Sequence, residues 1–140
     1  MLRLTSGSIE PAVRTFINHV LVGTALPDEA VGSSDLTDHV YPLIYELHKI
    51  DPGLLLHILP NICAQLKTDE EDLRLRAVKL LGQLFSSQYT DYASQFQRNF
   101  REYLSRFIDV SPAIRIEMID CCSLIMKKKP VHKDAVEGKW

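Results

Sequence analysis

The stretch Asp51–Phe85, DPGLLLHILPNICAQLKTDEEDLRLRAVKLLGQLF, decides the fold of this chain. Its apolar residues recur at spacings of three and four, which is typical of helices that bury one face. Asp51 followed by Pro52 predicts a helix start, because aspartate accepts from free backbone N–H groups and proline presets the angle φ. Thr68 and Glu71 show the pattern of a capping box for a second helix. The stretch therefore predicts two packed helices joined by a short acidic turn.

The second of these helices, about Glu70–Ser86, has two distinct faces when projected at roughly 100° per residue. Leu73 and Leu81 lie on the packed face. The opposite face carries Asp72, Arg76, Lys79 and Gln83. We predict that Arg76, Lys79 and Gln83 are exposed and form a candidate partner-binding surface. Arg74 projects toward the edge of the packed face, so we expect it to make a structural contact with a turn carboxylate.

A repeat becomes visible beyond this stretch. A shift of about 41 residues superposes Leu73-Arg74 on Ile114-Arg115. The same shift aligns the two helices predicted within 51–85 with two further helices, at about 92–107 and 112–128. A period near 40 with two helices per copy is typical of HEAT repeats, which stack into a solenoid. Asp109, Ile114 and Arg115 also match the HEAT pattern of an Asp, four residues, an Ile or Val, and an Arg. Thr68 stands where the preceding copy would carry that aspartate.

The N-terminal part resembles a third, more degenerate copy. Helices are predicted at about 9–22 and 35–50, joined by an exposed, mobile loop at 23–34, and Pro42 predicts a kink or a later start in the second. We therefore predict an all-α, HEAT-type α-solenoid over residues 1–128, with about three antiparallel helix pairs at 9–50, 52–86 and 92–128. Residues 129–140 are polar and interrupted by proline, which predicts a disordered tail.

Composition restricts the class of protein. The chain has 140 residues, 46% hydrophobic and 24% charged, with a formal net charge of −2, so no global basic field is available to hold a polyanion. It has neither an apolar run of the roughly 20 residues that a membrane span needs nor a secretory signal, and we expect an intracellular protein. Cys63, Cys121 and Cys122 lie within apolar helical patterns and are predicted to be buried, reduced thiols.

We found no motif that predicts catalysis, cofactor binding or a metal site. The five histidines are scattered without a pair at i and i+4; they are His19, His39, His48, His57 and His132. The acidic run Asp69–Asp72 fits a solvated helix start better than a metal site. Glycine-rich phosphate loops and nucleophile elbows are absent from the sequence. We therefore expect a protein that is not an enzyme and has no cofactor.

Aromatic and basic residues alternate over 92–107, which fits either base stacking in a nucleic-acid site or ordinary core packing. The helical spacing of the aromatic residues favours core packing. When the face with Arg76 and Lys79 is carried forward by the repeat, it becomes Ala113, Glu117, Asp120 and Leu124. A continuous basic track is therefore missing, and we expect no direct sequence-specific binding of nucleic acid.

A closer resemblance rests on residues spread along the chain. They include Ile9-Glu10-Pro11, Asp35-Leu36, His39-Val40, Tyr45-Glu46-Leu47, Ile50-Asp51, Leu54-Leu55-Leu56, Leu59-Pro60, Leu66-Lys67, Val78-Lys79-Leu80-Leu81, Leu84-Phe85, Arg106-Phe107, and Arg115 with Glu117. In order and spacing, the run from Ser8 to about Met126 resembles part of the HEAT-repeat body of the precocious-dissociation-of-sisters family. Members of that family are cohesin-associated regulators of sister chromatid cohesion.

The resemblance implies a non-enzymatic scaffold that acts on chromatin in the nucleus. Family members bind the kleisin subunit of cohesin and recruit the wings-apart-like release factor or its antagonist sororin. They are much longer than this chain, so we expect an excerpt or a truncated product. The family's motif for the release-factor and sororin peptides does not occur here, and no partner-binding residue is carried over. The repeat alone leaves one alternative, a generic HEAT adaptor of nuclear transport or phosphatase-scaffold type.

Overall fold

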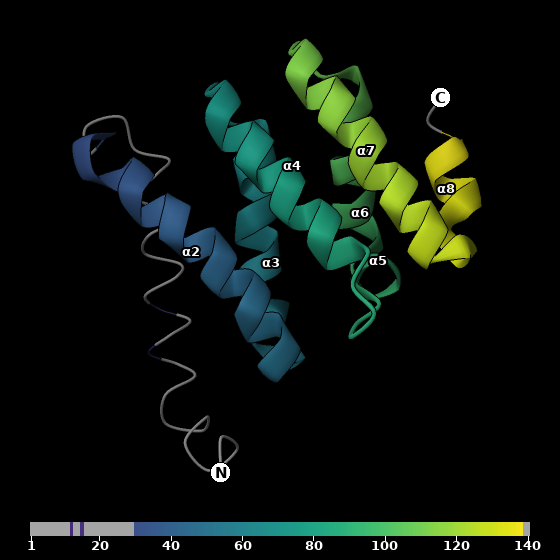
Figure 1. The fold of residues 1–140 in the computed structure, drawn as a ribbon, viewed down its shortest axis with the longest axis horizontal. Coiled ribbons are helices and arrows are strands. Elements are labelled where there is room, and N and C mark those ends of the chain that lie inside the picture. The colour runs from purple at the N-terminus through teal and green to yellow at the C-terminus, as the bar shows by residue number, and fades with distance from the viewer. Residues whose placement is uncertain (1–11, 13–14, 16–29, 139–140) are drawn as a thin grey trace. The chain divides into compact units, whose positions relative to one another are not determined.

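The computed structural model describes residues 12, 15 and 30–138, and within these it contains helices and turns but no strand (Figure 1). Of the predicted helix at 9–22 the structure describes residues 12 and 15, and most of the predicted loop at 23–34 lies outside the described residues. The chain divides into two compact units, Met1–Ile62 and Cys63–Trp140.

In the first unit, α2 spans Ala30–Ile50. It begins earlier than predicted, so Ala30–Ser34 belong to a helix and not to the loop. Pro42 lies inside α2 without ending it. An internal proline removes one backbone hydrogen bond, and the buried side chains of Tyr41 and Ile44 on either side of it help to hold the helix together.

The 3₁₀ turn η2, Pro52–Leu54, leads into α3, Leu55–Ala64. Asp51 caps the turn as expected, because its Oδ1 accepts from the N–H of Gly53 at 3.1 Å. The helix α3 continues through Pro60 and is largely apolar on its buried side. That side carries Leu55, Ile58, Leu59 and Ile62, all fully buried. Leu56 is 47% exposed.

The second unit holds the remaining helices. They are η3 (Gln65–Lys67), α4 (Glu71–Phe85), α5 (Tyr92–Gln95), α6 (Gln97–Leu104), η4 (Ser105–Ile108), α7 (Pro112–Lys128), η5 (Pro130–His132) and α8 (Lys133–Glu137). Helices α4 and α7 pack side by side and run in the same direction (Figure 1). This is the relation that the 41-residue repeat predicted for the second helices of two successive pairs.

Three aromatic rings form the centre of the second unit. The ring centroids of Phe85 and Phe100 are 4.9 Å apart and meet edge to face, and Tyr103 lies 5.2 Å from Phe85. Phe85 belongs to α4, and the other two belong to α6. All three side chains are buried, so these aromatic residues pack in the core as their helical spacing indicated.

The close contact between α4 and α7 depends on a glycine. A Cβ atom placed on Gly82 would lie 2.5 Å from Sγ and 2.8 Å from Cβ of Cys121, both much shorter than a van der Waals contact. The two helix backbones therefore approach closely at this point because α4 has no side chain there.

The predicted capping box at Thr68 is wrong. Thr68 does not form a capping box: α4 begins at Glu71, its N-cap is Glu70, and no side chain caps it. Thr68 Oγ1 instead donates to the carbonyl of Gln65 at 3.1 Å, at the end of η3.

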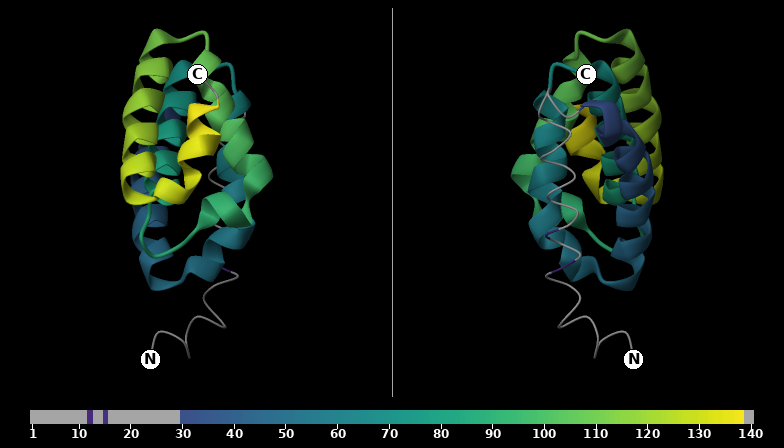
Figure 2. Two further views of the ribbon diagram at one scale, coloured as in Figure 1. Left: turned by 90° about the vertical axis from the view of Figure 1, so that its right-hand side faces the viewer. Right: turned by 90° about the vertical axis from the view of Figure 1, so that its left-hand side faces the viewer.

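The described part of the predicted disordered tail is ordered. The turn η5 and the helix α8 follow α7 directly, and Figure 2 shows α8 beside the end of α7. Val136 is fully buried, which anchors α8 through the hydrophobic effect. His132 also bonds to Asp91, with Nε2 and Oδ1 2.8 Å apart. These contacts order the segment, although its composition is that of a linker.

We predict that Gly82→Ala destabilises the chain by about 1–3 kcal/mol, because the new methyl group overlaps Cys121. In an exposed helix the same change would stabilise, since alanine is the better helix former. Urea unfolding followed by circular dichroism measures the difference. Adding Cys121→Ala to Gly82→Ala should recover part of the loss, and Gly53→Ala, where the nearest atom is a movable side-chain oxygen, is the control. An unchanged or higher unfolding midpoint for Gly82→Ala would contradict the prediction.

Candidate partner-binding surface

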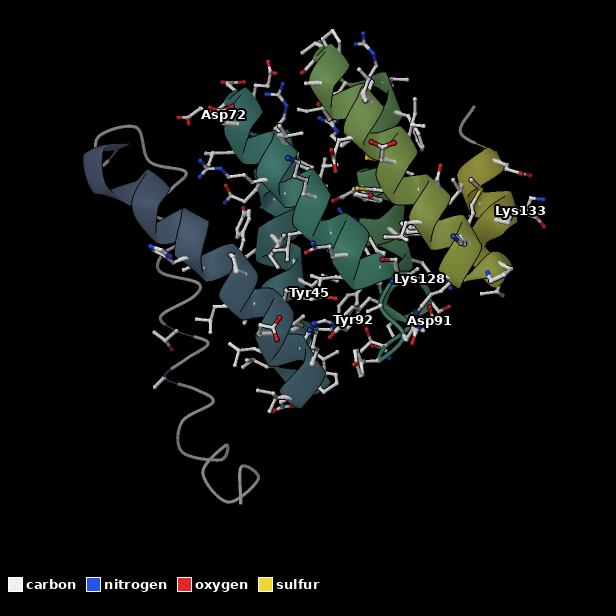
Figure 3. The ribbon with its side chains drawn as sticks, in the orientation of Figure 1. Tyr45, Asp72, Asp91, Tyr92, Lys128 and Lys133 are labelled. Carbon is white, nitrogen blue, oxygen red and sulfur yellow. The ribbon has the colours of Figure 1, made fainter. Side chains whose placement is uncertain are left out.

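The predicted partner-binding surface lies on α4. Lys79 and Gln83 are exposed, and Asp72, at the start of the helix in Figure 3, is exposed as well. Arg76 differs from the prediction because it is half-buried. The residues at three- and four-residue spacing on the other side are buried, among them Leu73, Ala77 and Leu81. The surface therefore presents one amide and one lysine cation to solvent, with the half-buried Arg76 beside them.

The corresponding face of α7 has different chemistry. Ala113, Asp120 and Leu124 are exposed, and Glu117 is half-buried. Neighbouring exposed positions on α7 add Ile116, 61% exposed, and Ile119. The surface thus changes from basic on α4 to acidic and apolar on α7. This change suits recognition of an irregular protein surface better than recognition of a uniform polyanion.

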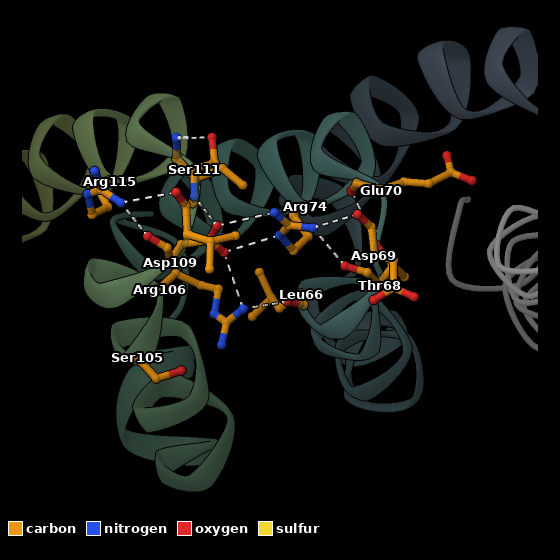
Figure 4. A network of polar contacts seen from close by, with 12 residues as sticks. Leu66, Thr68, Asp69, Glu70, Arg74, Ser105, Arg106, Asp109, Ser111 and Arg115 are labelled. Carbon is orange, nitrogen blue, oxygen red and sulfur yellow. Dashed lines mark hydrogen bonds and ion pairs between the residues drawn. The ribbon is translucent and has the colours of Figure 1, made fainter.

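A buried ion pair fixes how α4 and α7 lie relative to each other (Figure 4). Arg74, on α4, donates from Nε to Asp109 Oδ2 at 3.1 Å and from Nη2 to Oδ1 at 3.2 Å. The Arg74 and Asp109 side chains are only 8% and 1% exposed. Arg74 also donates from Nη1 to the carbonyls of Thr68 and Asp69, at 2.9 and 3.0 Å. The prediction that Arg74 makes a structural contact with a turn carboxylate is confirmed.

The sequence did not indicate that Asp109 gathers donors from both helix pairs. Its carboxylate also accepts from Arg106 Nη1 at 3.2 Å and from the N–H of Ser111 at 2.9 Å. Arg115, which the HEAT pattern pairs with this position, instead donates to the backbone carbonyl of Asp109 at 2.6 Å. The spacing of three residues between Arg106 and Asp109 was the available signal for the extra contact.

These donors control the ionisation of Asp109. Burial alone would raise the pKa of its carboxyl group, because the charged form loses hydration. The Ser111 N–H and the guanidinium groups of Arg74 and Arg106 outweigh that effect and hold the pKa below its ordinary value. The ion pair is therefore fully formed at neutral pH.

The three cysteines are free, buried thiols, as predicted. Burial is the main cause that raises the pKa of Cys63, Cys121 and Cys122 to about 12. A thiol with so high a pKa is a poor nucleophile near neutral pH.

The histidines do not form a cluster that could bind a metal ion. His48 is buried and bonds to the carbonyl of Tyr45, and burial lowers its pKa. His39 and His57 are exposed, and His19 lies outside the described residues. Within residues 12, 15 and 30–138, no group of three or more His, Cys, Asp or Glu side chains is placed to hold a metal ion.

Among the helices that the structure describes, none is long and apolar enough to cross a membrane.

Comparisons with known proteins point to one family. The sequence model described as "Sister chromatid cohesion protein PDS5 protein" matches residues 1–139. PDS5 homolog A-B of Xenopus laevis is 38% identical over 138 residues, which is 98% of this chain and 10% of that protein. PDS5 homolog B of Homo sapiens is 37% identical over 138 residues, 98% of this chain and 9% of that protein. The chain thus spans about a tenth of the length of these relatives.

A solved structure supports the fold. Pds5 in the Pds5–Scc1 complex matches with a TM-score of 0.75 over 89% of this chain and 19% of that chain, at 20% sequence identity. At this identity the match concerns the fold alone. It agrees with the predicted all-α, HEAT-type solenoid.

We predict that Asp109→Asn lowers the free energy of unfolding by about 3 kcal/mol at pH 7, because it leaves the buried Arg74 guanidinium without its counter-charge. Asp109 has a lowered pKa, so its contribution is present above the ordinary aspartate value of 3.8 and is lost as the pH falls below it. Urea titrations at several pH values should show the gap between wild type and variant closing in acid.

The exposed carboxylate of Asp120 supplies the control, and Asp120→Asn should leave stability within about 0.5 kcal/mol of wild type. A gap for Asp109→Asn that stays constant from neutral pH to pH values below 3.8 would contradict the assigned ion pair.

We also predict that the three thiols react at pH 8 at least about a hundredfold more slowly in the folded chain than in denaturant, because the folded thiols are buried and carry little thiolate. An aromatic disulfide reagent followed by absorbance measures both rates. Equal rates in the two conditions would show that these cysteines are not core residues.

Proposed function

Because this chain belongs to the PDS5 family of sister chromatid cohesion proteins, we propose that it is a non-enzymatic protein-interaction segment of a cohesin regulator. In this role it would help to control how long cohesin stays on chromatin and whether cohesion is maintained. The observation that carries the proposal is the family match, which extends over residues 1–139.

The proposed partners follow from the relatives. The solved relative is Pds5 in complex with Scc1, so the kleisin subunit of cohesin is the first partner that we propose for the protein containing this segment. Release and maintenance factors of cohesin are the second class, by family membership. The proposed location is chromatin in the nucleus, where sister chromatid cohesion takes place.

The fixed arrangement of α4 and α7 supports the proposed role as a scaffold. Buried contacts such as Arg74–Asp109 and the Gly82–Cys121 approach hold α4 and α7 in one arrangement. Residues outside these contacts, including Lys79 and Gln83, are thereby presented on a rigid helix pair. A rigid surface loses less conformational entropy on binding than a mobile one. The adaptor of nuclear transport or phosphatase type, which the repeat alone left open, is not favoured by the family match.

Co-precipitation from nuclear extract tests the proposal. The bait is the full-length product that contains this segment, and the control bait is a HEAT solenoid of an unrelated family. We expect the cohesin kleisin to be enriched on the first bait over the control. Equal amounts of kleisin on both baits would refute the proposed function.

We predict that Lys79→Glu combined with Gln83→Ala reduces kleisin recovery about tenfold, because this exposed part of α4 is the proposed partner-binding surface. Both side chains are exposed, so the double change should leave the unfolding midpoint unaltered. Arg76 is left intact because it is half-buried. The matched control is Lys127→Glu, which reverses an exposed lysine on α7. Equal loss in both variants would assign the effect to net charge and not to this surface.

A further inference from the structure

A hollow lies on the second unit, away from the exposed residues of α4. Its volume is about 490 Å³, and it is bordered by α5 and α6 on one side and by η5 and α8 on the other. Its floor is apolar and is made by the buried residues Ala93, Phe100 and Leu104. Val131, 80% exposed, lines the opposite wall. An apolar ligand group that bound here would bury the exposed side chain of Val131 against the apolar floor.

The charged side chain that lines the hollow is positive. Arg101 lines it and is exposed, and no acidic residue lines it. The nearest carboxylate along the chain, Glu102, already has cations at 3.5 Å, from Arg98, and at 3.6 Å, from Lys67. Among residues 30–138, Arg101 makes no ion pair. The hollow therefore offers a guanidinium group whose counter-charge is not supplied by the described part of the chain.

The wall formed by η5 and α8 is held in place by contacts of His132, which itself lines the hollow, and of Lys129. His132 bonds to Asp91 at 2.8 Å, and its ring lies 5.7 Å from that of Phe100. Lys129 forms an ion pair with Asp91 at 3.7 Å and donates to the carbonyl of Thr90. Figure 3 shows Asp91 in the connection between α4 and α5, close to the Lys128 end of α7. The hollow is thus largely preformed, which lowers the entropic cost of binding.

We propose that this hollow binds a short segment of a partner protein in which an apolar side chain stands next to an aspartate or glutamate. The apolar side chain lies over Phe100 and Leu104, and the carboxylate accepts from Arg101. The proposal rests on the proposed role as a protein-interaction segment and adds to it the chemistry of one binding element.

A peptide segment fits these features better than other ligands do. A nucleic-acid strand needs several phosphate contacts, whereas the hollow has one arginine. A small anion would use Arg101 but would leave the apolar floor and Val131 uncovered. A peptide that combines an apolar and an acidic side chain satisfies both parts of the surface.

Amide chemical shifts of the ¹⁵N-labelled 140-residue chain test the proposal. The probes are an acetylated, amidated hexapeptide of sequence SLEDFS and its neutral counterpart SLQNFS. We expect saturable shifts of amides that border the hollow, such as those of Ala93 and Ala135, with the acidic peptide. The neutral peptide should bind at least about fivefold more weakly, because it lacks the charge-assisted bond.

Variants locate the binding. Arg101→Gln should weaken the acidic peptide about tenfold and leave the neutral peptide unchanged. Arg98→Gln is the matched control, since Arg98 lies on the same helix but does not line the hollow, and it should change affinity less than about twofold. Ala135→Phe fills the hollow from an exposed position and should abolish binding of both peptides. Unperturbed spectra elsewhere show that each variant is folded.

Three outcomes would overturn the proposal. One is the absence of saturable shifts at these amides with millimolar acidic peptide. Another is equal weakening by Arg98→Gln and Arg101→Gln, which would indicate a general charge effect. The third is a set of shifts that depends on protein concentration alone, which would assign the hollow to contact between copies of the chain. None of them affects the kleisin test, which depends on the family match and on the exposed residues of α4.

Discussion

The bidentate ion pair between Arg74 and Asp109 is the interaction on which the described architecture of the second unit depends. It joins α4 to the turn before α7, and its partners carry the connection further: Arg106 binds the carbonyl of Leu66 at 3.0 Å, and Arg115 binds the carbonyl of Asp109. Removing two charges from water costs several kcal/mol unless their remaining hydrogen-bonding capacity is satisfied. Here carbonyls and a backbone N–H supply those bonds, so the pair specifies one register between successive helix pairs.

Apolar packing completes what the ion pair begins. A single HEAT copy cannot bury its own apolar face and gains stability by stacking on its neighbour. In the second unit this stacking is close because Gly82 lets α4 approach Cys121 on α7, while Phe85 reaches across to the aromatic residues of α6. The surface presented to partners therefore follows from the interior. Its shape is set by buried residues such as Gly82 and Phe85.

Much of the fold was predictable from the sequence, because helix periodicity and a 41-residue repeat are properties of the chain itself. The side of α4 that is buried, the structural role of Arg74 and the burial of the three cysteines followed from spacing. What remained unpredictable depends on tertiary contacts. The capping role of Thr68 failed because the helix starts at Glu71, and a boundary shifts easily by a residue or two. The order of α8 depends on the burial of Val136, and the hollow beside it exists only once η5 has folded back toward α6.

The ion pair also has a mechanical consequence. A force that pulls α4 away from α7 must break two parallel guanidinium–carboxylate bonds together, since both end on the same carboxylate. Arg74 also donates to two backbone carbonyls in the turn before its own helix. Part of the force is therefore carried by hydrogen bonds between the two turns. The bidentate ion pair thus links the two helix pairs at a single point. Stretching of the second unit should therefore be resisted at this turn, and at the other ends of α4 and α7 the contacts of Lys129 and His132 with Asp91 resist it as well.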